Sequence, residues 1–488
     1  MLSFVASARE ALRYRLAFWS LWALAGCAVG GNGSGSKDAE SKSGEVGACE
    51  ANANQAKDDK DNDGLSDEEE RRLGTRPELP DSDGDKITDF GEKAIGTNPL
   101  DPDDTLPSRD FFVVLPHQGE AQTRTLKFTT NIKSADVYFL VDATGSMGDE
   151  IDNVRSTLST IAAQAKAAIP DLQMGVGSFR DFPYASYGDE GDAPYAHQIS
   201  VTDDLASVQQ GLSSLYAGGG GDMAESQVEA LYQAASGEGL TSNAGPTANI
   251  PAASCAAGMR GYPCFRPAST PVLVLVSDAP WHQGPANVYP YAGISPTPHT
   301  FDQAKDAMAR IGARMVSAVV EGIGEARTHA EAMLRATGSV DAAGNPLVYE
   351  APNGQVSQSI ITGIQTLARE TPQEVAAASV NGDNPGGFDA RPFLISIVPR
   401  EGYDKDGVPG RGYLAKDEQK FSGVSPDTQV EFTLTFRNTI KAHETRALIY
   451  KLRVDVVGPG GAQLDSRNAY VVVPPCGNTK FEAPAPLI

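Results

Sequence analysis

Short apolar runs alternate with amphipathic stretches through the middle of the chain. Between the runs, apolar residues recur every three or four positions, as at Ile151, Val154 and Leu158, which is the spacing of one helix face. Strands that alternate with helices indicate an α/β fold, a doubly wound and mainly parallel sheet with helices on both faces. The strand-like runs are Val137–Val141, Gln173–Phe179, Val272–Ser277, Met315–Val320 and Leu347–Tyr349, and helical patterns cover Leu205–Leu215, Glu225–Ala235, Phe301–Ile311, Ala326–Thr337 and Val356–Arg369.

The regions on either side show strand patterns instead. Apolar residues fill Phe111–Leu115, and alternating residues follow up to Thr129. Beyond the α/β region, strand-like runs lie at Phe393–Val398, Val430–Phe436, Leu448–Val456 and Tyr470–Val473. The pattern predicts a β-sandwich built from residues 108–133 and 371–488, with the α/β domain, residues 134–370, inserted into it.

Oxygen-bearing side chains follow the first buried strand. The run Val137–Val141 stops at Asp142, and Thr144 and Ser146 follow at alternate positions, which point to one side of an extended chain. One carboxylate and two hydroxyls suit a hard divalent cation. Ligands of open α/β sheets bind past the carboxyl ends of strands, where Asp278 and the loop containing Asp222 and Glu225 are also expected. These acids could instead cap helices or lie in their first turns without a metal.

The spacing Asp142-x-Thr144-x-Ser146 resembles the metal-ion-dependent adhesion site of von Willebrand factor type A domains, whose fold is Rossmann-like. Residues 111–369 further resemble the β-subunit head of integrins. That resemblance implies an adhesion site holding Mg²⁺ or Mn²⁺, an adjacent Ca²⁺ site, and a third site put in doubt because Ala224 replaces a proline. The residues implied are Asp142, Thr144, Ser146, Glu225 and Asp278 for the adhesion site, Asp149 and Glu150 for the adjacent site, and Asp222 for the third.

An acidic repeat occupies residues 57–105. Its two copies carry acids at positions 1, 3, 5, 9 and 12, as calcium loops of the EF-hand type do, but the flanking helices are expected to be missing. The repeats resemble thrombospondin type 3 calcium repeats, which implies a calcium-stiffened stalk. Lys86 stands where the second loop should carry glycine, and a disordered acidic linker is the alternative. The proposed ligands are Asp59, Asp61, Asp63, Asp67 and Glu70, then Asp81, Asp83, Asp85, Asp89 and Glu92.

The first residues are typical of a bacterial lipoprotein. Residues 1–26 combine basic residues with a short apolar run, and Leu24-Ala25-Gly26-Cys27 resembles a lipobox, which implies lipidation of Cys27 and sorting to the outer membrane or surface of a Gram-negative cell. Residues 27–56 are expected to form a flexible tether. In an oxidising compartment Cys255 and Cys264 are expected to pair, which would leave Cys49 with Cys476.

The net charge and the absence of a catalytic motif in the sequence narrow the function classes that this chain can belong to. The net charge of −23 argues against a nucleic-acid partner. No general base is evident beside Asp142, and His282, His299 and His329 are expected at surface or loop positions, so an enzyme, such as a metal-dependent hydrolase, is disfavoured. We expect a lipid-anchored surface protein that binds a protein or matrix ligand through an acidic residue of that ligand. The alternative is an envelope scaffold whose metals only stabilise the fold.

Overall fold

The computed structural model describes residues 58–320, 324–476 and 481–484. The expectations for the signal peptide, Cys27, the tether and Cys49 lie outside these residues. None of the helices in the described part of the chain is both long and apolar enough to cross a bilayer.

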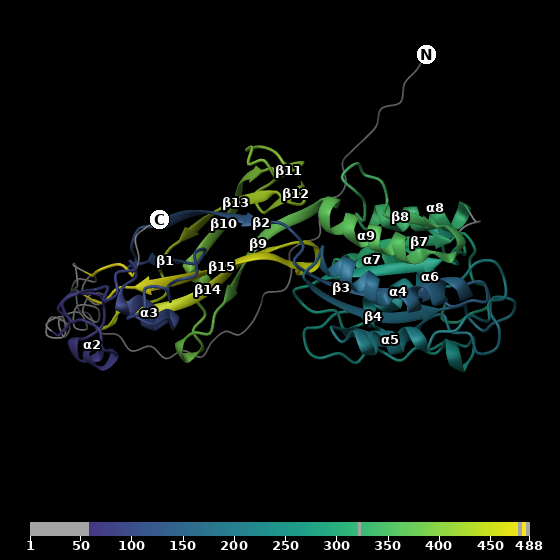
Figure 1. Ribbon diagram of the computed structural model, residues 1–488, viewed down its shortest axis with the longest axis horizontal. Coiled ribbons are helices and arrows are strands. Elements are labelled where there is room, and N and C mark those ends of the chain that lie inside the picture. Colours follow the sequence, from purple (N-terminus) through teal and green to yellow (C-terminus); the bar gives the residue numbers. More distant parts are fainter. Residues whose placement is uncertain (1–57, 321–323, 477–480, 485–488) are drawn as a thin grey trace, which may run out of the picture. The chain divides into compact units, whose positions relative to one another are not determined.

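The α/β domain is built on a six-stranded sheet with the order β5-β4-β3-β6-β7-β8 (Figure 1). All neighbouring strands run parallel except β4 and β5, which are antiparallel. The central strand β3 is buried along almost its whole length, which explains its continuous apolar run. The strands are β3 (Ser134–Asp142), β4 (Asp171–Phe179), β5 (Ala196–Thr202), β6 (Thr270–Ser277), β7 (Arg314–Val320) and β8 (Val348–Ala351).

Two groups of helices cover this sheet. Helix α4 contacts α5 and α9, whereas α7 contacts α6 and α8. Because parallel crossovers are right-handed, connections that leave β3 and β6 in opposite directions place α4 and α7 on opposite faces. The helices are α4 (Gly148–Lys166), α5 (Leu205–Ser213), α6 (Gln227–Ser236), α7 (Phe301–Ile311), α8 (Gly324–Ala336) and α9 (Val356–Glu370).

Strands from before and after the α/β domain share two further sheets. One has the order β1-β15-β14-β9-β12-β11 and the other β10-β13-β2. Strand β1 pairs with β15 and β2 pairs with β13, and Phe432 of β13 packs against Phe128 and Phe421 between the sheets. The strands are β1 (Phe111–Val114), β2 (Gln122–Thr129), β9 (Gln373–Asn381), β10 (Leu394–Tyr403), β11 (Ala415–Lys416), β12 (Lys420–Val424), β13 (Gln429–Phe436), β14 (Leu448–Val457) and β15 (Gln463–Val473).

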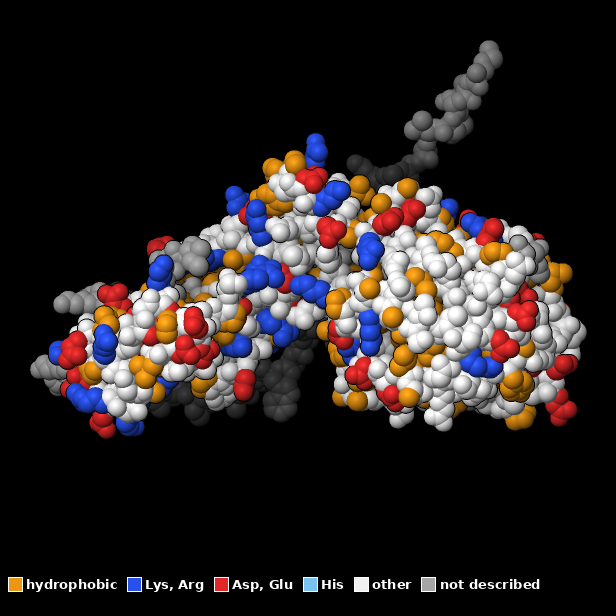
Figure 2. Space-filling model, viewed as in Figure 1, with side chains coloured by type: hydrophobic (Ala, Val, Ile, Leu, Met, Phe, Trp, Pro, Cys, Tyr) orange, Lys and Arg blue, Asp and Glu red, His pale blue; other side chains and the backbone are white. Residues whose placement is uncertain are grey.

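The repeats contain helices that the sequence analysis did not expect. Each acidic loop runs into a short helix, α2 (Asp67–Leu73) or α3 (Asp89–Ile95). Ser66 and Thr88 cap their amino ends, and a left-handed glycine ends each helix, so the expectation of no flanking helix was wrong on one side of each loop. Acidic and basic side chains are interspersed over these helices on the face shown in Figure 2.

The repeats are not a free stalk. Ile87 of the second loop is buried with Phe112, Tyr470 and Val472, which belong to β1 and β15. The repeats therefore share apolar packing with the six-stranded sheet.

The cysteines of the described residues are disulfide-bonded, as expected in an oxidising compartment. Cys255 and Cys264 form the expected disulfide. Cys476 is also disulfide-bonded, and the expected partner, Cys49, lies outside the described residues.

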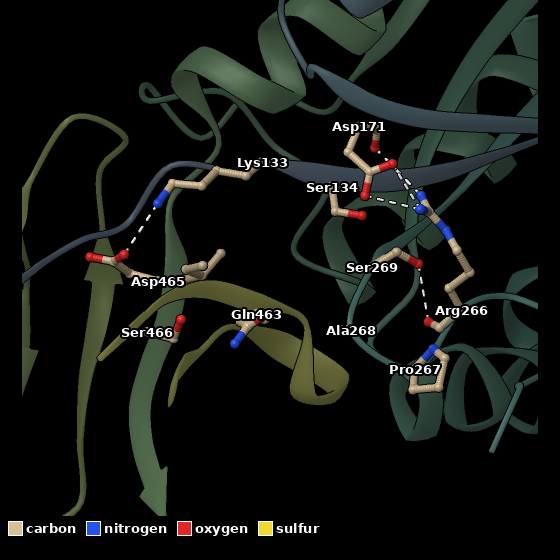
Figure 3. A pocket seen from close by; sticks show the side chains of 11 residues that line it. Lys133, Ser134, Asp171, Arg266, Pro267, Ala268, Ser269, Gln463, Asp465 and Ser466 are labelled. Carbon is tan, nitrogen blue, oxygen red and sulfur yellow. Dashed lines mark hydrogen bonds and ion pairs between the residues drawn. The ribbon is translucent and has the colours of Figure 1, made fainter. Parts of the chain in front are cut away.

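A buried ion pair closes the amino end of β3. Asp136 is fully buried and accepts hydrogen bonds from Arg266 Nε at 2.7 Å and Ser269 Oγ at 2.6 Å. The guanidinium of Arg266 also reaches Asp171 at 2.8 Å, beside a cavity of about 510 Å³ (Figure 3). Lys133 and Asp465 pair on the other side of this cavity, at 3.2 Å. The buried charge at this end of β3 is therefore matched by a cation.

Replacing Arg266 by methionine leaves the Asp136 carboxylate buried without its cation. We expect the free energy of unfolding to fall by about 3–5 kcal/mol in chemical denaturation. The control Arg327→Met removes an exposed ion pair and should cost less than about 1 kcal/mol. Equal effects of the two substitutions would contradict this assignment.

Candidate metal centre

Three loops meet past the carboxyl ends of β3 and β6. They enclose a pocket of about 290 Å³. Adjacent parallel strands end at one edge of the sheet, which explains why the loops after β3 and β6 converge. The pocket is lined by Thr144, Gly145 and Ser146 from the first loop, Gly219–Gly221, Asp222, Met223 and Glu225 from the second, and Asp278 and Ala279 from the third.

Asp142 lies beneath this pocket and fixes two of the loops. Its Oδ1 accepts hydrogen bonds from Thr144 N at 3.0 Å and Thr144 Oγ1 at 2.7 Å. Its Oδ2 accepts one from Ser277 Oγ at 2.7 Å. Because the Thr144 hydroxyl donates its proton to Asp142, its lone pairs remain available to a cation. Gln227 Nε2 in turn donates to Ser277 Oγ at 3.0 Å and holds that hydroxyl in place.

The glycine-rich second loop passes close to its neighbours. Gly219 and Gly220 have φ values of +75° and +86°, and a Cβ on Gly219 would lie 1.9 Å from Asp192 Oδ1. Asp192 accepts a hydrogen bond from Gly220 N at 2.8 Å. Arg180 Nε donates to Ala143 O at 2.8 Å, so Arg180 supports the first loop. Sequence reasoning missed the supporting roles of Arg180 and Asp192, because they act through contacts between distant loops.

The pocket holds buried carboxyl groups without a basic partner. Asp142 is fully buried and Glu225 is 4% exposed, and among the described residues no Lys, Arg or His pairs with either. Burial raises the pKa of Asp142 to about 7. Burial, and then the neighbouring Asp142, Asp181 and Asp222 carboxylates, raise the pKa of Glu225 to about 11. Glu225 Oε2 has no hydrogen-bond partner in the described structure, so the donor set fits a hard divalent cation.

The residues of the adjacent site lie in the first turn of α4. Glu150 is buried, and its Oε2 has no hydrogen-bond partner among the described groups, whereas Asp149 is exposed. Burial and then the Asp278 and Asp149 carboxylates raise the pKa of Glu150. Glu150 therefore shares its electrostatic surroundings with Asp278 of the pocket.

A third cluster contains Asp222, together with two residues that sequence reasoning did not select. His282 Nε2 lies 3.3 Å from Asp181 Oδ2 and 3.2 Å from Asp222 Oδ1, in an arrangement that could hold a metal ion. His282 Nδ1 lies 2.7 Å from Tyr289 O, a contact that requires Nδ1 to carry a proton. Burial opposes the charged imidazole, but the Asp181 and Asp222 carboxylates outweigh it and raise the pKa of His282.

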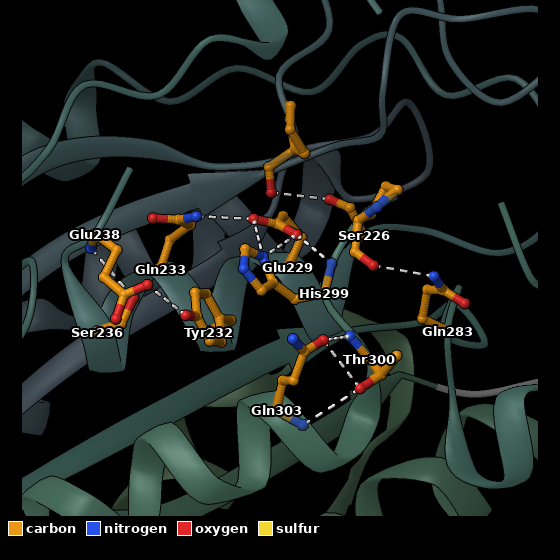
Figure 4. Close-up of polar contacts among 12 residues, drawn as sticks. Ser226, Glu229, Tyr232, Gln233, Ser236, Glu238, Gln283, His299, Thr300 and Gln303 are labelled. Atoms are coloured by element: carbon orange, nitrogen blue, oxygen red, sulfur yellow. Dashed lines mark hydrogen bonds and ion pairs between the residues drawn. The ribbon is translucent and has the colours of Figure 1, made fainter. Parts of the chain in front are cut away.

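One of the three histidines differs from the expected surface or loop position. His329 is buried within α8, so a surface or loop position was wrong for it, and His282 is buried within its loop. His299 is half-buried, and its Nδ1 lies 2.9 Å from the buried Glu229 of α6 (Figure 4). Gln233 Nε2 donates to the same carboxylate at 2.8 Å. This network anchors the segment before α7 to α6.

The repeat loops gather their acids as calcium loops do. The first three acids of each loop lie together, and Glu70 and Glu92 are fully buried beside them. Burial and neighbouring aspartates raise the pKa of each of these two glutamates to about 8. Asp89 accepts hydrogen bonds from Ser82, and Asp67 accepts one from Lys60 N, so each of these carboxylates is held by the residue at position 2 of its own loop. Buried oxygens without a described hydrogen-bond partner are Asp61 Oδ2, Glu70 Oε1 and Oε2, Asp83 Oδ2, Asp85 Oδ2 and Glu92 Oε2, and this donor set fits a divalent cation in each loop.

Comparisons with known proteins agree with two parts of the sequence analysis. Residues 136–243 match the family model of the von Willebrand factor A domain, and residues 59–77 and 81–102 match that of the bacterial TSP3 repeat. No curated protein matches the chain.

Among solved structures, the chain is similar to the pilus adhesin SpaC from Lactobacillus rhamnosus GG. The open conformation is 11% identical, with a TM-score of 0.30, over 72% of this chain and 45% of that one. Another form is also 11% identical, with a TM-score of 0.28, over 72% and 46%. The chain thus spans less than half the length of these structures.

Lys86 adopts a left-handed backbone with φ of +83°, where the first loop has Gly64. Replacing Lys86 by glycine should relieve about 1 kcal/mol of strain and tighten calcium binding by the second loop about five-fold in calorimetric titration. Lys405→Gly, in an exposed loop elsewhere, should leave calcium binding unchanged. An unchanged or weaker affinity in Lys86→Gly would show that this residue does not strain the loop.

The raised pKa values of Glu70 and Glu92 predict how the metal-free repeats respond to pH. A carboxyl whose folded pKa exceeds its unfolded value stabilises the fold at low pH and loses that contribution as pH rises toward the folded pKa. The metal-free chain should therefore melt at a lower temperature at pH 8 than at pH 5.5, and calcium should stabilise it more at pH 8. The double variant Glu70→Gln/Glu92→Gln should show a smaller pH dependence, and wild-type behaviour in that variant would refute the assignment.

Proposed function

We propose that this chain is a cell-surface protein that binds a protein or matrix ligand through a divalent cation at the three-loop pocket. The observation that carries the proposal is the pocket itself, in which Thr144 and Ser146 supply neutral hydroxyls above the buried Asp142 and Glu225. The match to the von Willebrand factor A family over residues 136–243 supports it.

The residues suggest how the pocket would hold a cation and a ligand. Thr144 and Ser146 would bind Mg²⁺ or Mn²⁺ through hydroxyl oxygens, with Asp142, Glu225 and Asp278 adding charge directly or through water. Ser146 and Asp222 are exposed, so the pocket is open to solvent. The cation supplies an electrophilic site for an oxygen from outside, and an acidic residue of the partner is the matching ligand.

Binding is favoured over catalysis. His282, in the cluster with Asp181 and Asp222, is the candidate general base beside the pocket. Both of its ring nitrogens already face protein oxygens. We therefore propose no enzymatic activity. Ca²⁺ would occupy the adjacent site at Asp149 and Glu150 and the two repeats, and lipidation of Cys27 would hold the protein in the cell envelope at the outer membrane.

A structural envelope scaffold is the second candidate. The observation that favours it is the packing of the calcium repeats on β1 and β15, which links cation binding to the stability of the fold. In that case the metals stabilise the chain and no partner depends on them.

Capture of partners separates the two candidates. The wild-type protein, coupled to beads, should retain a ligand from matrix proteins and envelope extracts in Mg²⁺ or Mn²⁺ but not in EDTA. Thr144→Val/Ser146→Ala should abolish retention and weaken Mg²⁺ binding at least about tenfold, because it removes two ligand oxygens. The control Ser213→Ala alters an exposed serine of α5 and should retain the ligand. Capture that survives both EDTA and the double variant would overturn the adhesive function, and a metal-dependent melting shift without capture would support the scaffold.

A further inference from the structure

Residues 481–484 dock as an extended peptide on the two repeats. Glu482 N donates a hydrogen bond to Asn62 O of the first loop, and Thr88 N, at the start of α3, donates to Pro484 O, both at 2.9 Å. The two backbone bonds fall on alternate residues of the segment, the spacing of a peptide bound in β-like fashion. Each repeat therefore holds one end of the same four residues.

Side chains add specificity at both ends. The ring of Phe481 packs edge-on against Phe90, with centroids 6.3 Å apart, and joins the cluster formed by Ile87, Phe112, Tyr470 and Val472. Pro484 is buried at the other end. The contacts select an aromatic residue and a proline three positions apart.

Two glycines of the repeats make room for these side chains. A Cβ on Gly64 would lie 3.2 Å from the Phe481 ring, and a Cβ on Gly91 would lie 2.9 Å from Pro484 Cβ. Each repeat thus places one glycine beneath one side chain of the segment. We call the surface formed by Asn62, Gly64, Thr88, Phe90 and Gly91 the peptide surface.

The peptide surface is continuous with both acidic loops. In loops with this spacing the carbonyl at position 7 binds calcium, and in the second loop that carbonyl belongs to Ile87. The same peptide unit carries Thr88 N, which donates to Pro484. A cation bound to the Ile87 carbonyl would therefore orient the Thr88 N–H that holds the segment.

The first loop contributes in a second way. Asp63, at position 5, is fully buried, and its Oδ1 accepts from Leu65 N at 2.7 Å. Its Oδ2 accepts from Phe90 N at 2.9 Å and so positions the ring on which Phe481 packs. Without a cation the clustered acids of both loops repel one another, and the geometry of the peptide surface is no longer held.

We propose that the two repeats form a calcium-dependent binding surface for an extended peptide of the type aromatic-x-x-Pro, and that its occupant is this chain's own segment 481–484. The calcium concentration then decides whether the segment is held against β1 and β15 or released. This inference is independent of the three-loop pocket and of any adhesive partner.

Hydrogen exchange on the intact protein tests the calcium dependence. The amides of Thr88 and Glu482 should exchange at least about tenfold faster in EDTA than in millimolar calcium, whereas amides in the centre of β3 should not change. Asp81→Asn/Glu92→Gln should show the fast exchange even in calcium, and Asp103→Asn, at an exposed aspartate just after the second repeat, should behave as wild type. Equal protection of Thr88 and Glu482 with and without calcium would overturn the proposal.

Binding in trans tests the peptide specificity. Phe481→Ala/Pro484→Ala should vacate the peptide surface while leaving the repeats intact. A fluorescent peptide Lys-Phe-Glu-Ala-Pro-Ala, which reproduces the chain around Phe481, should then bind in calcium and not in EDTA, as measured by anisotropy. The same peptide with alanine in place of phenylalanine should not bind. Absence of saturable binding by the unaltered peptide in calcium would contradict a peptide surface. If calcium no longer raises the melting temperature of the double variant, its repeats are not intact, and the same titration is made with the single variant Phe481→Ala.

Discussion

Buried negative charge at the carboxyl end of β3 is the constraint on which the account depends. At the amino end of the same strand, Asp136 is equally buried, but Arg266 neutralises it. At the carboxyl end, Asp142 and Glu225 have no basic partner among the described residues, and only hydroxyl and amide donors satisfy some of their oxygens. Burying an unpaired carboxylate is costly, so such a site is stable with a proton or with a cation. The exposed hydroxyl of Ser146 and the pocket volume of about 290 Å³ favour the cation.

In the described part of the chain, the repeats also bury carboxyl groups without basic partners, but each does so within one short loop. Their carboxylates converge within a few residues of each other, whereas the pocket draws its acids from three distant loops. In both places the structure leaves buried oxygens without hydrogen-bond donors, at Glu70 and Glu92 as at Glu225. Because a ligand that binds only the folded chain stabilises it, a cation bound at either place would stabilise the fold. The packing of Ile87 against β1 and β15 extends that stabilisation beyond the loops.

The sequence allowed prediction of those features that a local pattern encodes. Strands β3 and β6 are buried on both faces and so appear as apolar runs. The oxygen side chains of Asp142, Thr144 and Ser146 stand out directly after the first run, although Thr144 and Ser146 lie in a bend and a turn and not in extended backbone. Strand β5 was missed because all its residues are half-buried, which leaves no alternation to read. Helices α2 and α3 were missed because their first turns contain acids that were read as loop ligands, namely Asp67 and Glu70 in α2 and Asp89 and Glu92 in α3. Arg180, Asp192 and His282 act through residues far away in the chain, so spacing could not identify them.

The most direct test of the central claim is anomalous diffraction from crystals of the intact protein equilibrated with Mn²⁺. The account predicts a manganese peak in the pocket, bounded by the side chains of Thr144, Ser146 and Glu225, and its disappearance in the Thr144→Val/Ser146→Ala variant. Ordered loops around an empty pocket at saturating Mn²⁺, with manganese bound only at the repeats, would contradict it.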